Sequence, residues 1–179
     1  MLYVVTGGSG SGKSEYAENL TVSLGGARVY IATMQVYGEE GRQRVARHRR
    51  MREGKQFVTV ECPVDLDKIT EKTDLYSLIS GNVMLLECMS NLAANEMFSW
   101  DGGKKTAELV KDRILEGVKK LLKQCRHLVI VTNEVFSDGN VYDSETMEYI
   151  RCLGMINAAL AGMADQVIEV VCGIPVPLK

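Results

Sequence analysis

A glycine-rich stretch near the N-terminus has the residue types and the spacing that bind phosphate. The run follows the apolar stretch LYVVT and fills the motif GxxxxGK[ST] with Gly7, Gly8, Ser9, Gly10, Ser11, Gly12, Lys13 and Ser14. Glycines let successive backbone amides turn inward around phosphate oxygens, and the N-terminus of a following helix adds partial positive charge. Lys13 can reach the outer phosphates, and the Ser14 hydroxyl can ligate Mg²⁺. A merely flexible turn would not need a Lys-Ser pair there, so we expect a nucleoside triphosphate to bind at this loop.

A basic segment at residues 41–53, GRQRVARHRRMRE, is the second feature that could do chemistry. It contains six arginines and His48, one of two histidines in the chain. On a helix, Arg44, His48 and Arg52 would share one face, so a bound nucleotide could find a nucleophile and positive charge together. A solvated basic helix, or one that binds nucleic acid, is equally open at this point. The segment is short and lacks interleaved aromatic residues, which argues against nucleic acid.

Short apolar runs alternate with longer amphipathic stretches along the chain. We expect strands at residues 2–6, 28–34, 57–61, 82–88, 127–134 and 166–173. Helical spacing recurs at Leu109, Val110, Ile114, Val118, Leu121 and Leu122, and again at Met147, Ile150, Leu153, Ile156 and Leu160, with Ser144 as a candidate N-cap. Strands rich in Val, Ile and Leu that alternate with helices predict an α/β fold with a mainly parallel sheet covered on both faces.

The C-terminal segment GIPVPLK predicts an edge strand. Its prolines, Pro175 and Pro177, stand at alternate positions, which suits a strand whose amides face no partner. Gly173 and Ile174 could form the tight turn of an antiparallel hairpin.

The composition is that of an ordinary globular protein. The 179 residues fit one domain, which we expect to span residues 1–179, and 46% of them are apolar. A formal net charge of −2 gives no general attraction to nucleic acid or acidic membranes. We expect no membrane span and no signal peptide, and therefore a cytoplasmic protein. The five dispersed cysteines lack any CxxC pair, which favours reduced thiols in core positions.

Polar residues follow the predicted strand at 127–134. Asn133 and Glu134 come after VIVT, at the carboxyl edge where open α/β sheets bind ligands. They could orient a substrate or a metal, or cap the entry to a helix. The irregular segment 137–144, SDGNVYDS, follows closely and is expected to be an active-site loop. His127 begins the strand, and we expect it to be structural.

With these motifs identified, the sequence resembles the adenosylcobinamide kinase/adenosylcobinamide-phosphate guanylyltransferase family of cobalamin biosynthesis over nearly its whole length. The resemblance is carried by VTGGSGSGKSEYAE at 5–18, VYIATM at 29–34, RVARHR at 44–49, VEC at 60–62, LLEC at 85–88, VTNEV at 131–135 and NAALAGMADQVIEVVCGIPVPLK at 157–179. Many nucleotide-binding proteins share the phosphate loop alone. The histidine in an arginine-rich segment, together with the later motifs, is much more specific.

The resemblance implies a bifunctional enzyme on a RecA-like P-loop NTPase fold. Such an enzyme would phosphorylate the aminopropanol hydroxyl of adenosylcobinamide with ATP or GTP, and then transfer GMP from GTP to that phosphate. It also implies a homotrimer and a guanylylated histidine, which the RVARHR motif assigns to His48. The nucleotide contacts that it implies are Gly7 through Ser14, Ala32, Thr33, Met34, Arg49, Arg50, Met51, Arg52, Glu61 and Glu87.

This chemistry agrees with the residues present. A neutral imidazole can attack the α-phosphorus of GTP in line, and nearby arginines would stabilise the extra negative charge and disfavour imidazolium. Ser14 and Glu87 would hold Mg²⁺, which neutralises the outer phosphate oxygens. Glu87 also fits a strand-end carboxylate facing solvent, and Glu61 fits the exposed last residue of an alternating strand.

The chain departs from the family pattern at two places. FSDGNVYDSET follows VTNEV where many members have a GxGIVP segment, and Phe57 stands where a tryptophan is common. The first change falls in the loop expected near the acceptor and bears on corrinoid specificity. Two alternatives follow: a P-loop kinase of another small alcohol, in which His48 only binds phosphate, or a nucleotide-regulated module that binds nucleic acid.

Overall fold

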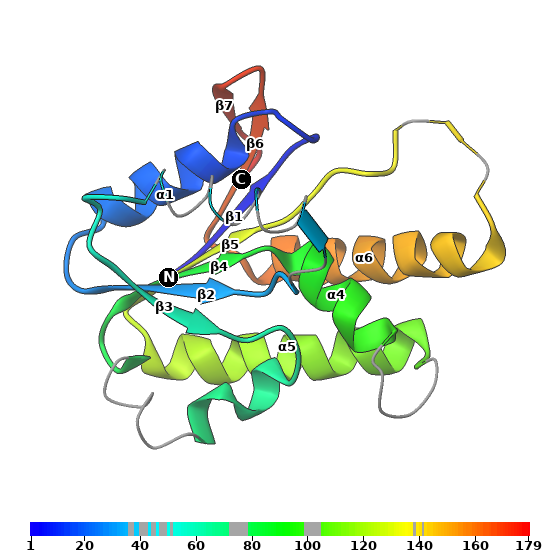
Figure 1. Cartoon of the computed structure of the whole chain (residues 1–179), viewed down its shortest axis with the longest axis horizontal. Coiled ribbons are helices and arrows are strands. Elements are labelled where there is room, and N and C mark those ends of the chain that lie inside the picture. Colours follow the sequence, from blue (N-terminus) through cyan, green and yellow to red (C-terminus); the bar gives the residue numbers. More distant parts are fainter. Residues whose placement is uncertain are drawn as a thin grey trace.

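Helices are interspersed among the strands along the chain (Figure 1). The computed structural model describes residues 1–35, 38, 39, 43, 46, 50, 52–71, 79–98, 105–137, 139, 140 and 142–179. The strands are β1 (Leu2–Thr6), β2 (Arg28–Ala32), β3 (Phe57–Glu61), β4 (Val83–Glu87), β5 (His127–Val131), β6 (Gln166–Val171) and β7 (Ile174–Pro177). The helices are α1 (Lys13–Ser23), α4 (Met89–Met97), α5 (Ala107–Gln124) and α6 (Ser144–Met163), together with the short 3-10 helix η1 (Leu66–Glu71).

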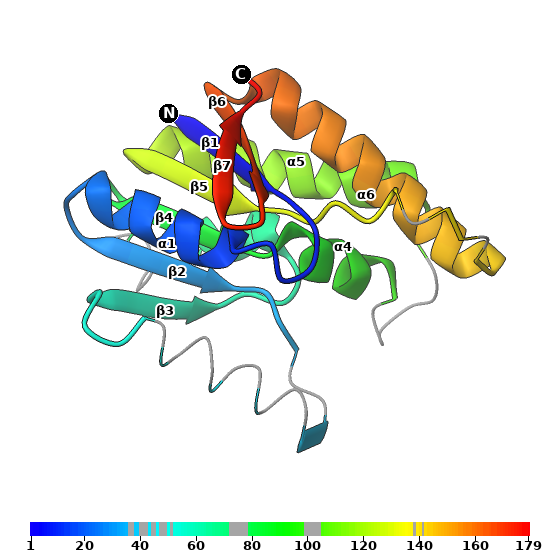
Figure 2. The ribbon, with the colours of Figure 1, turned by 90° about the horizontal axis from the view of Figure 1, so that it is seen from above.

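Within the described residues the strands form one seven-stranded sheet in the order β3-β2-β4-β5-β1-β6-β7. Neighbouring strands are parallel except for β6 and β7, which form the predicted antiparallel hairpin at one edge. Helix α1 covers one face, whereas α4, α5 and α6 cover the other (Figures 1 and 2). The predicted α/β fold with a mainly parallel sheet is confirmed.

The central strands are apolar at successive positions because helices cover both of their faces. All five residues of β4, VMLLE, are buried, including its final glutamate. The edge strand β3, in contrast, exposes Val58, Thr59 and Glu61. Continuous burial of this kind is typical of parallel strands inside an α/β sheet.

The register of the sheet brings the ends of the parallel strands into one row. Glu61, Ala32 and Glu87 are neighbours across β3, β2 and β4, and Val131 and Val5 continue the row on β5 and β1. The loops that follow these strands therefore leave from one edge, which is where ligands bind in open α/β sheets. The glycine-rich loop after β1 is one of them.

Two details of the predicted helices are wrong. The N-cap of α6 is Asp143 rather than Ser144, since Asp143 Oδ1 accepts hydrogen bonds from the backbone amides of Glu145 and Thr146, both at 2.9 Å. Leu109 and Met147 were expected in apolar stripes, but they are 50% and 46% exposed. The buried stripe of α5 instead runs through positions 107, 110, 114, 117, 118 and 121, so position 109 faces away from it.

The C-terminal hairpin also turns one residue earlier than predicted. Val171 pairs with Ile174, so the two loop residues are Cys172 and Gly173. Their φ angles are 50° and 80°, and a two-residue hairpin loop favours such left-handed conformations. Cys172 is consequently exposed, whereas Cys62 and Cys152 occupy core positions as expected.

Gly117 lets α5 lie directly against η1. A Cβ atom at Gly117 would be 2.8 Å from the backbone nitrogen of Asp67 and 2.9 Å from the carbonyl carbon of Leu66. We expect Gly117→Ala to lower the free energy of unfolding by about 2 kcal/mol, because two backbones must separate.

Gly162 on α6 is the matched control, since a Cβ there would meet nothing within 4 Å. Gly162→Ala should raise the free energy of unfolding by about 0.5 kcal/mol through helix propensity alone. Urea denaturation of both variants measures the difference. Equal changes in the two would contradict the close approach of α5 to η1.

Candidate active site

The loop between β1 and α1 has the backbone conformation of a phosphate cradle. Gly12, immediately before the helix, has a φ of 91°, which disfavours any side chain. Gly7 has no room for one, since a Cβ there would lie 2.5 Å from the carbonyl oxygen of Val170. These two glycines therefore turn the loop while keeping it tight against β6, and α1 begins directly at Lys13.

Two backbone hydrogen bonds hold the loop from either side. The amide of Glu134, after β5, donates to the carbonyl of Gly7 at 3.1 Å, and the amide of Gly173, in the β6–β7 turn, donates to the carbonyl of Ser11 at 2.8 Å. The hydroxyl oxygen of Ser11 is buried and has no hydrogen-bond partner within the described residues. A buried hydroxyl without a partner inside such a loop is suited to a phosphate oxygen.

Lys13 and Glu87 bring opposite charges to the floor of the site. Each is only 8% exposed, and Lys13 Nζ donates to the carbonyl of Gly8 at 2.9 Å. Burial lowers the pKa of Lys13, while the neighbouring Cys88 and Glu87 act to raise it. Glu87, at the end of β4, is therefore close enough to the loop lysine to interact with it electrostatically. The interpretation of Glu87 as a carboxylate facing solvent is wrong.

Tyr30 links Glu87 to the end of the basic segment. Its hydroxyl donates to Glu87 Oε2 at 3.2 Å, and the Arg52 guanidinium carbon lies 3.4 Å from the centroid of its ring. Burial and the charge of Glu87 raise the pKa of Tyr30 far above its usual range, so the phenol keeps its proton and donates. The aromatic ring thus stacks against a cation on its face and orients a carboxylate through its hydroxyl.

A second contact joins the residues after the basic segment to α1. Lys55 Nζ lies 2.8 Å from Glu18 Oε2, and the Glu18 side chain is fully buried. Burial raises the pKa of Glu18, whereas Lys55 lowers it. The carbonyl of Lys55 also accepts a hydrogen bond from Arg28 on β2 at 2.7 Å. The chain that returns from the basic segment is therefore fixed to the helix that begins at the phosphate loop.

Thr33 and Asn95 order the loops after β2 and β3. The Thr33 hydroxyl donates to the carbonyl of Cys88 at 2.8 Å and accepts from its amide at 2.7 Å. Asn95, on α4, donates to the carbonyls of Thr33 and Pro63 at 2.8 and 2.9 Å. Thr33 is fully buried, so its side chain braces the edge of the sheet.

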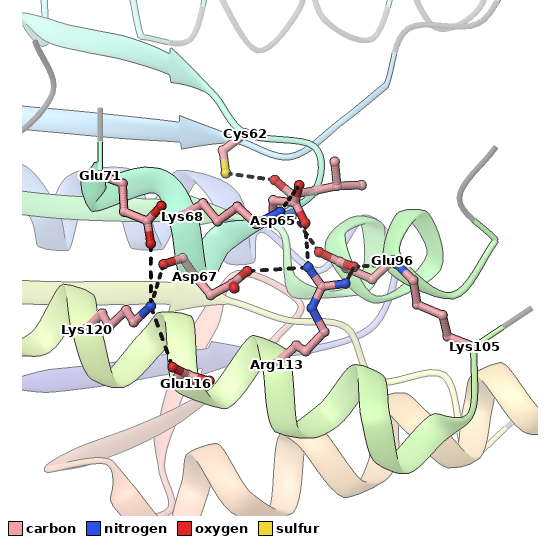
Figure 3. Close-up of polar contacts among 11 residues, drawn as sticks. Cys62, Asp65, Asp67, Lys68, Glu71, Glu96, Lys105, Arg113, Glu116 and Lys120 are labelled. Carbon is pink, nitrogen blue, oxygen red and sulfur yellow. Dashed lines mark hydrogen bonds and ion pairs between the residues drawn. The ribbon is translucent and has the colours of Figure 1, made fainter. Parts of the chain in front are cut away.

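An ionic cluster behind this edge fixes α4 and α5 relative to η1 (Figure 3). Glu96 is 1% exposed, accepts hydrogen bonds from the backbone amide of Asp65 at 2.6 Å and from Lys105 at 3.1 Å, and forms an ion pair with Arg113 at 3.3 Å. Arg113 also pairs with Asp65 and lies 3.6 Å from Asp67. A buried carboxylate with this many donors is satisfied, so the cluster is structural.

The structure brings part of the predicted site together. The phosphate loop, Glu87 and Ala32 meet at the carboxyl edge, and Arg52 lies beside them on Tyr30. Glu61 is in the same row but exposed on the edge strand β3, and Met34 is half-buried just beyond β2. Arg50 is exposed. His48, Arg49 and Met51 lie outside the described residues.

Asn133 and Glu134 do not cap a helix. Asn133 donates to the hydroxyl of Ser90 at 2.7 Å. Glu134 Oε1 accepts from the amide of Phe136 at 2.7 Å and from the hydroxyl of Ser137 at 3.0 Å, which closes a turn in its own loop. His127 lies at the first position of the central strand β5, at the end of the strands away from the glycine loop, where its ring packs edge-on against Tyr3.

Comparison of this sequence with known families identifies the family to which the chain belongs. The family described as cobinamide kinase / cobinamide phosphate guanyltransferase, CobU, matches residues 3–178. The chain belongs to the CobU family. It is accordingly a bifunctional enzyme with cobinamide kinase and cobinamide phosphate guanylyltransferase activities.

Curated relatives agree with the CobU assignment. The bifunctional adenosylcobalamin biosynthesis protein CobU of Escherichia coli (strain K12) is 34% identical over 189 residues, and 100% of each chain is covered. CobU of Salmonella typhimurium is 33% identical over 191 residues, again with 100% of each chain covered. CobP of Pseudomonas aeruginosa is 28% identical over 176 residues, which cover 98% of this chain and 96% of that protein.

Two solved structures share the fold of this chain. A KaiC-like protein from Pyrococcus horikoshii OT3 aligns with a TM-score of 0.55 at 13% identity, covering 94% of this chain and 71% of that one. A second solved structure, an ATPase domain, aligns with a TM-score of 0.53 at 8% identity, covering 94% and 68%. The P-loop NTPase fold is confirmed. Among the described residues, no helix is long and apolar enough to cross a membrane.

Gly7 and Gly8 provide a test of the cradle. Gly7→Ala should lower the free energy of unfolding by about 2 kcal/mol, because its methyl group would overlap the carbonyl oxygen of Val170. A Cβ on Gly8 would meet nothing within 4 Å, so Gly8→Ala should stay within about 0.5 kcal/mol of the wild type. Urea denaturation without nucleotide measures both. Equal stability of the two variants would contradict the close contact between Gly7 and the Val170 carbonyl of β6.

Proposed function

We propose that this enzyme binds its nucleoside triphosphates, ATP or GTP, on the loop from Gly7 to Ser14 and carries out both transfers at that one site. In the first step the aminopropanol hydroxyl of adenosylcobinamide attacks the γ-phosphorus, and the nucleoside diphosphate leaves. In the second, GMP from GTP is passed to the new phosphate. The observation that carries the proposal is the closed glycine loop with Lys13 buried beneath it, next to Glu87.

We further propose that the second transfer proceeds through His48. A neutral imidazole nitrogen attacks the α-phosphorus of GTP, a P–N bond forms, and the bond to the leaving pyrophosphate breaks. An oxygen of adenosylcobinamide phosphate then attacks the same phosphorus, the P–N bond breaks, and the imidazole is restored. The arginines of residues 41–53 would stabilise the extra negative charge at each attack.

Other residues are proposed to position the nucleotide. The contacts are Gly7, Gly8, Ser9, Gly10, Ser11, Gly12, Lys13, Ser14, Ala32, Thr33, Met34, Arg49, Arg50, Met51, Arg52, Glu61 and Glu87. Ser14 and Glu87 would hold Mg²⁺, which neutralises charge on the β- and γ-phosphates when bound. The burial of Glu87 and its proximity to Lys13 fit this pairing of a carboxylate with a phosphate site. Tyr30 holds the Glu87 carboxylate in place.

The remaining proposals concern the whole molecule. We propose a single domain over residues 1–179 that acts in the cytoplasm on a corrinoid substrate. The homotrimer that the family resemblance implies is proposed for this chain as well. Sedimentation of the purified protein measures the assembly.

The covalent step can be tested with GTP labelled at the α-phosphate. The wild type should form a labelled protein that is labile to acid and stable to base, and His48→Ala should form none, because the P–N bond needs the imidazole. The other histidine supplies the control: His127→Gln should label like the wild type, since His127 begins β5, at the end of the strands away from the glycine loop. Label of equal strength in His48→Ala would remove the histidine step and leave a kinase without a covalent intermediate.

Lys13 tests whether one loop serves both reactions. Lys13→Ala should lower both the kinase and the guanylyltransferase rates by at least about a hundredfold, because each step needs its phosphates held by this ammonium. Lys123→Ala, which removes an exposed lysine of α5, should change neither rate. Kinase turnover that survives in Lys13→Ala would contradict a single site for both transfers.

A further inference from the structure

Two adjoining hollows lie where the loop after β5 meets α6. The first, about 400 Å³, is lined by Glu134, Val135, Tyr142, Thr146, Tyr149 and Ile150, among others. The second, about 460 Å³, shares Thr146 and Tyr149 and extends to Ala94 and Phe98 at the end of α4. We call the two together the double hollow. Each has the size of a site for a small organic ligand.

The double hollow lies beside the phosphate loop. Its lining residue Glu134 donates its backbone amide to the carbonyl of Gly7 at 3.1 Å. On its other side, the Tyr149 hydroxyl donates to the carbonyl of Ser90 at 3.3 Å, and Ser90 comes three residues after Glu87. The double hollow is therefore connected to the glycine loop through Glu134 and to the segment after β4 through Tyr149.

Described residues on both sides of the double hollow are held by contacts with α6 or within their own turn. A Cβ atom on Gly154 of α6 would lie 3.4 Å from Phe136 Cε1, so the Phe136 ring packs on the helix at a glycine. Glu134 closes the turn at one end of the loop, and Asp143 caps α6 at the other. These contacts leave Tyr142 38% exposed and Phe98 44% exposed at the rim.

The chemistry of the lining differs from that of the phosphate loop. Val135, Ile150 and the rings of Tyr149 and Phe98 provide apolar surface, while the polar residues are acidic or carry hydroxyl groups. No lysine or arginine is among the described residues that line either hollow. Hydrogen bonds from backbone amides and from Thr146 hold the pKa of Asp143 below its usual range, so its charge persists. The lining suits an apolar or cationic ligand and disfavours a triphosphate.

We infer that the double hollow binds the corrin ring of adenosylcobinamide, with the aminopropanol arm directed toward the glycine loop; this rests on the proposed function. A corrinoid is a broad apolar ring with amide groups at its rim, and its adenosylated cobalt(III) form carries a net positive charge. Apolar side chains would pack on the ring, and carboxylates and hydroxyl groups would accept hydrogen bonds from the amides. The nucleotide and the acceptor are thereby sorted by charge into neighbouring sites.

Equilibrium dialysis of adenosylcobinamide, followed by its visible absorbance, tests the inference. Ile150→Gln and Tyr142→Ala should each weaken binding roughly tenfold, since each removes apolar contact with the ring. Leu109→Gln is the control, because Leu109 is 50% exposed on α5 and lines neither hollow. Its affinity should equal that of the wild type. Thermal unfolding of all three variants shows whether they fold.

The outcomes separate this inference from the histidine step, because labelling of His48 by GTP needs no corrinoid. Both variants of the double hollow should label like the wild type. The inference would be overturned if both variants bound adenosylcobinamide with the affinity of the wild type, or if Leu109→Gln lost as much affinity as they did. It would also be overturned if the wild type did not bind adenosylcobinamide. Weaker GTP binding with intact corrinoid binding would instead assign the double hollow to the guanine base. If wild-type labelling fails while the dialysis pattern holds, the corrinoid site stands without the covalent intermediate.

Discussion

The constraint on which the site depends is the closure of a short glycine loop by backbone from both neighbouring strands. In the sheet, β1 lies between β5 and β6. The segment after β5 donates one amide to the loop through Glu134, and the turn after β6 donates another through Gly173. Gly7 lies so close to Val170 that no side chain fits. The strand order and the loop conformation therefore support each other.

Several charged side chains are buried at or behind the carboxyl edge of the sheet. Lys13, Glu87, Glu18 and Glu96 are all nearly inaccessible to water, and each has a partner that offsets the cost of its burial. Such interactions are stronger inside the protein than at its surface, because little water screens them. They also fix the side chains in place. A triphosphate would therefore meet groups that are already oriented.

The sequence predicted the sheet and the phosphate loop because both depend on local patterns. Apolar runs of strand length and a motif of eight residues are visible without any knowledge of distant contacts. The helix cap at Asp143 and the turn at Cys172–Gly173 were missed by one residue, since neighbouring residues have similar propensities and only packing selects between them.

The contacts of Tyr30, Asn95 and Glu96 could not be predicted in the same way. Each joins segments far apart in the chain, such as Tyr30 with Glu87 or Asn95 with both Thr33 and Pro63. The sequence did carry a weak signal that Glu18 and Glu96 are buried, since each is a carboxylate on a helix that packs on the core. The role of His48 is expected from sequence alone.

The hairpin of β6 and β7 has a consequence for how the protein is made. The glycine loop is synthesised before strands β2 to β6, whereas the amide of Gly173 that holds it is synthesised only after them. In a nascent chain, the second of the two backbone hydrogen bonds to the loop can form only after this turn has emerged. Translation that stops short of it yields a protein with the full motif and a loop that is held only by the amide of Glu134, on the β5 side.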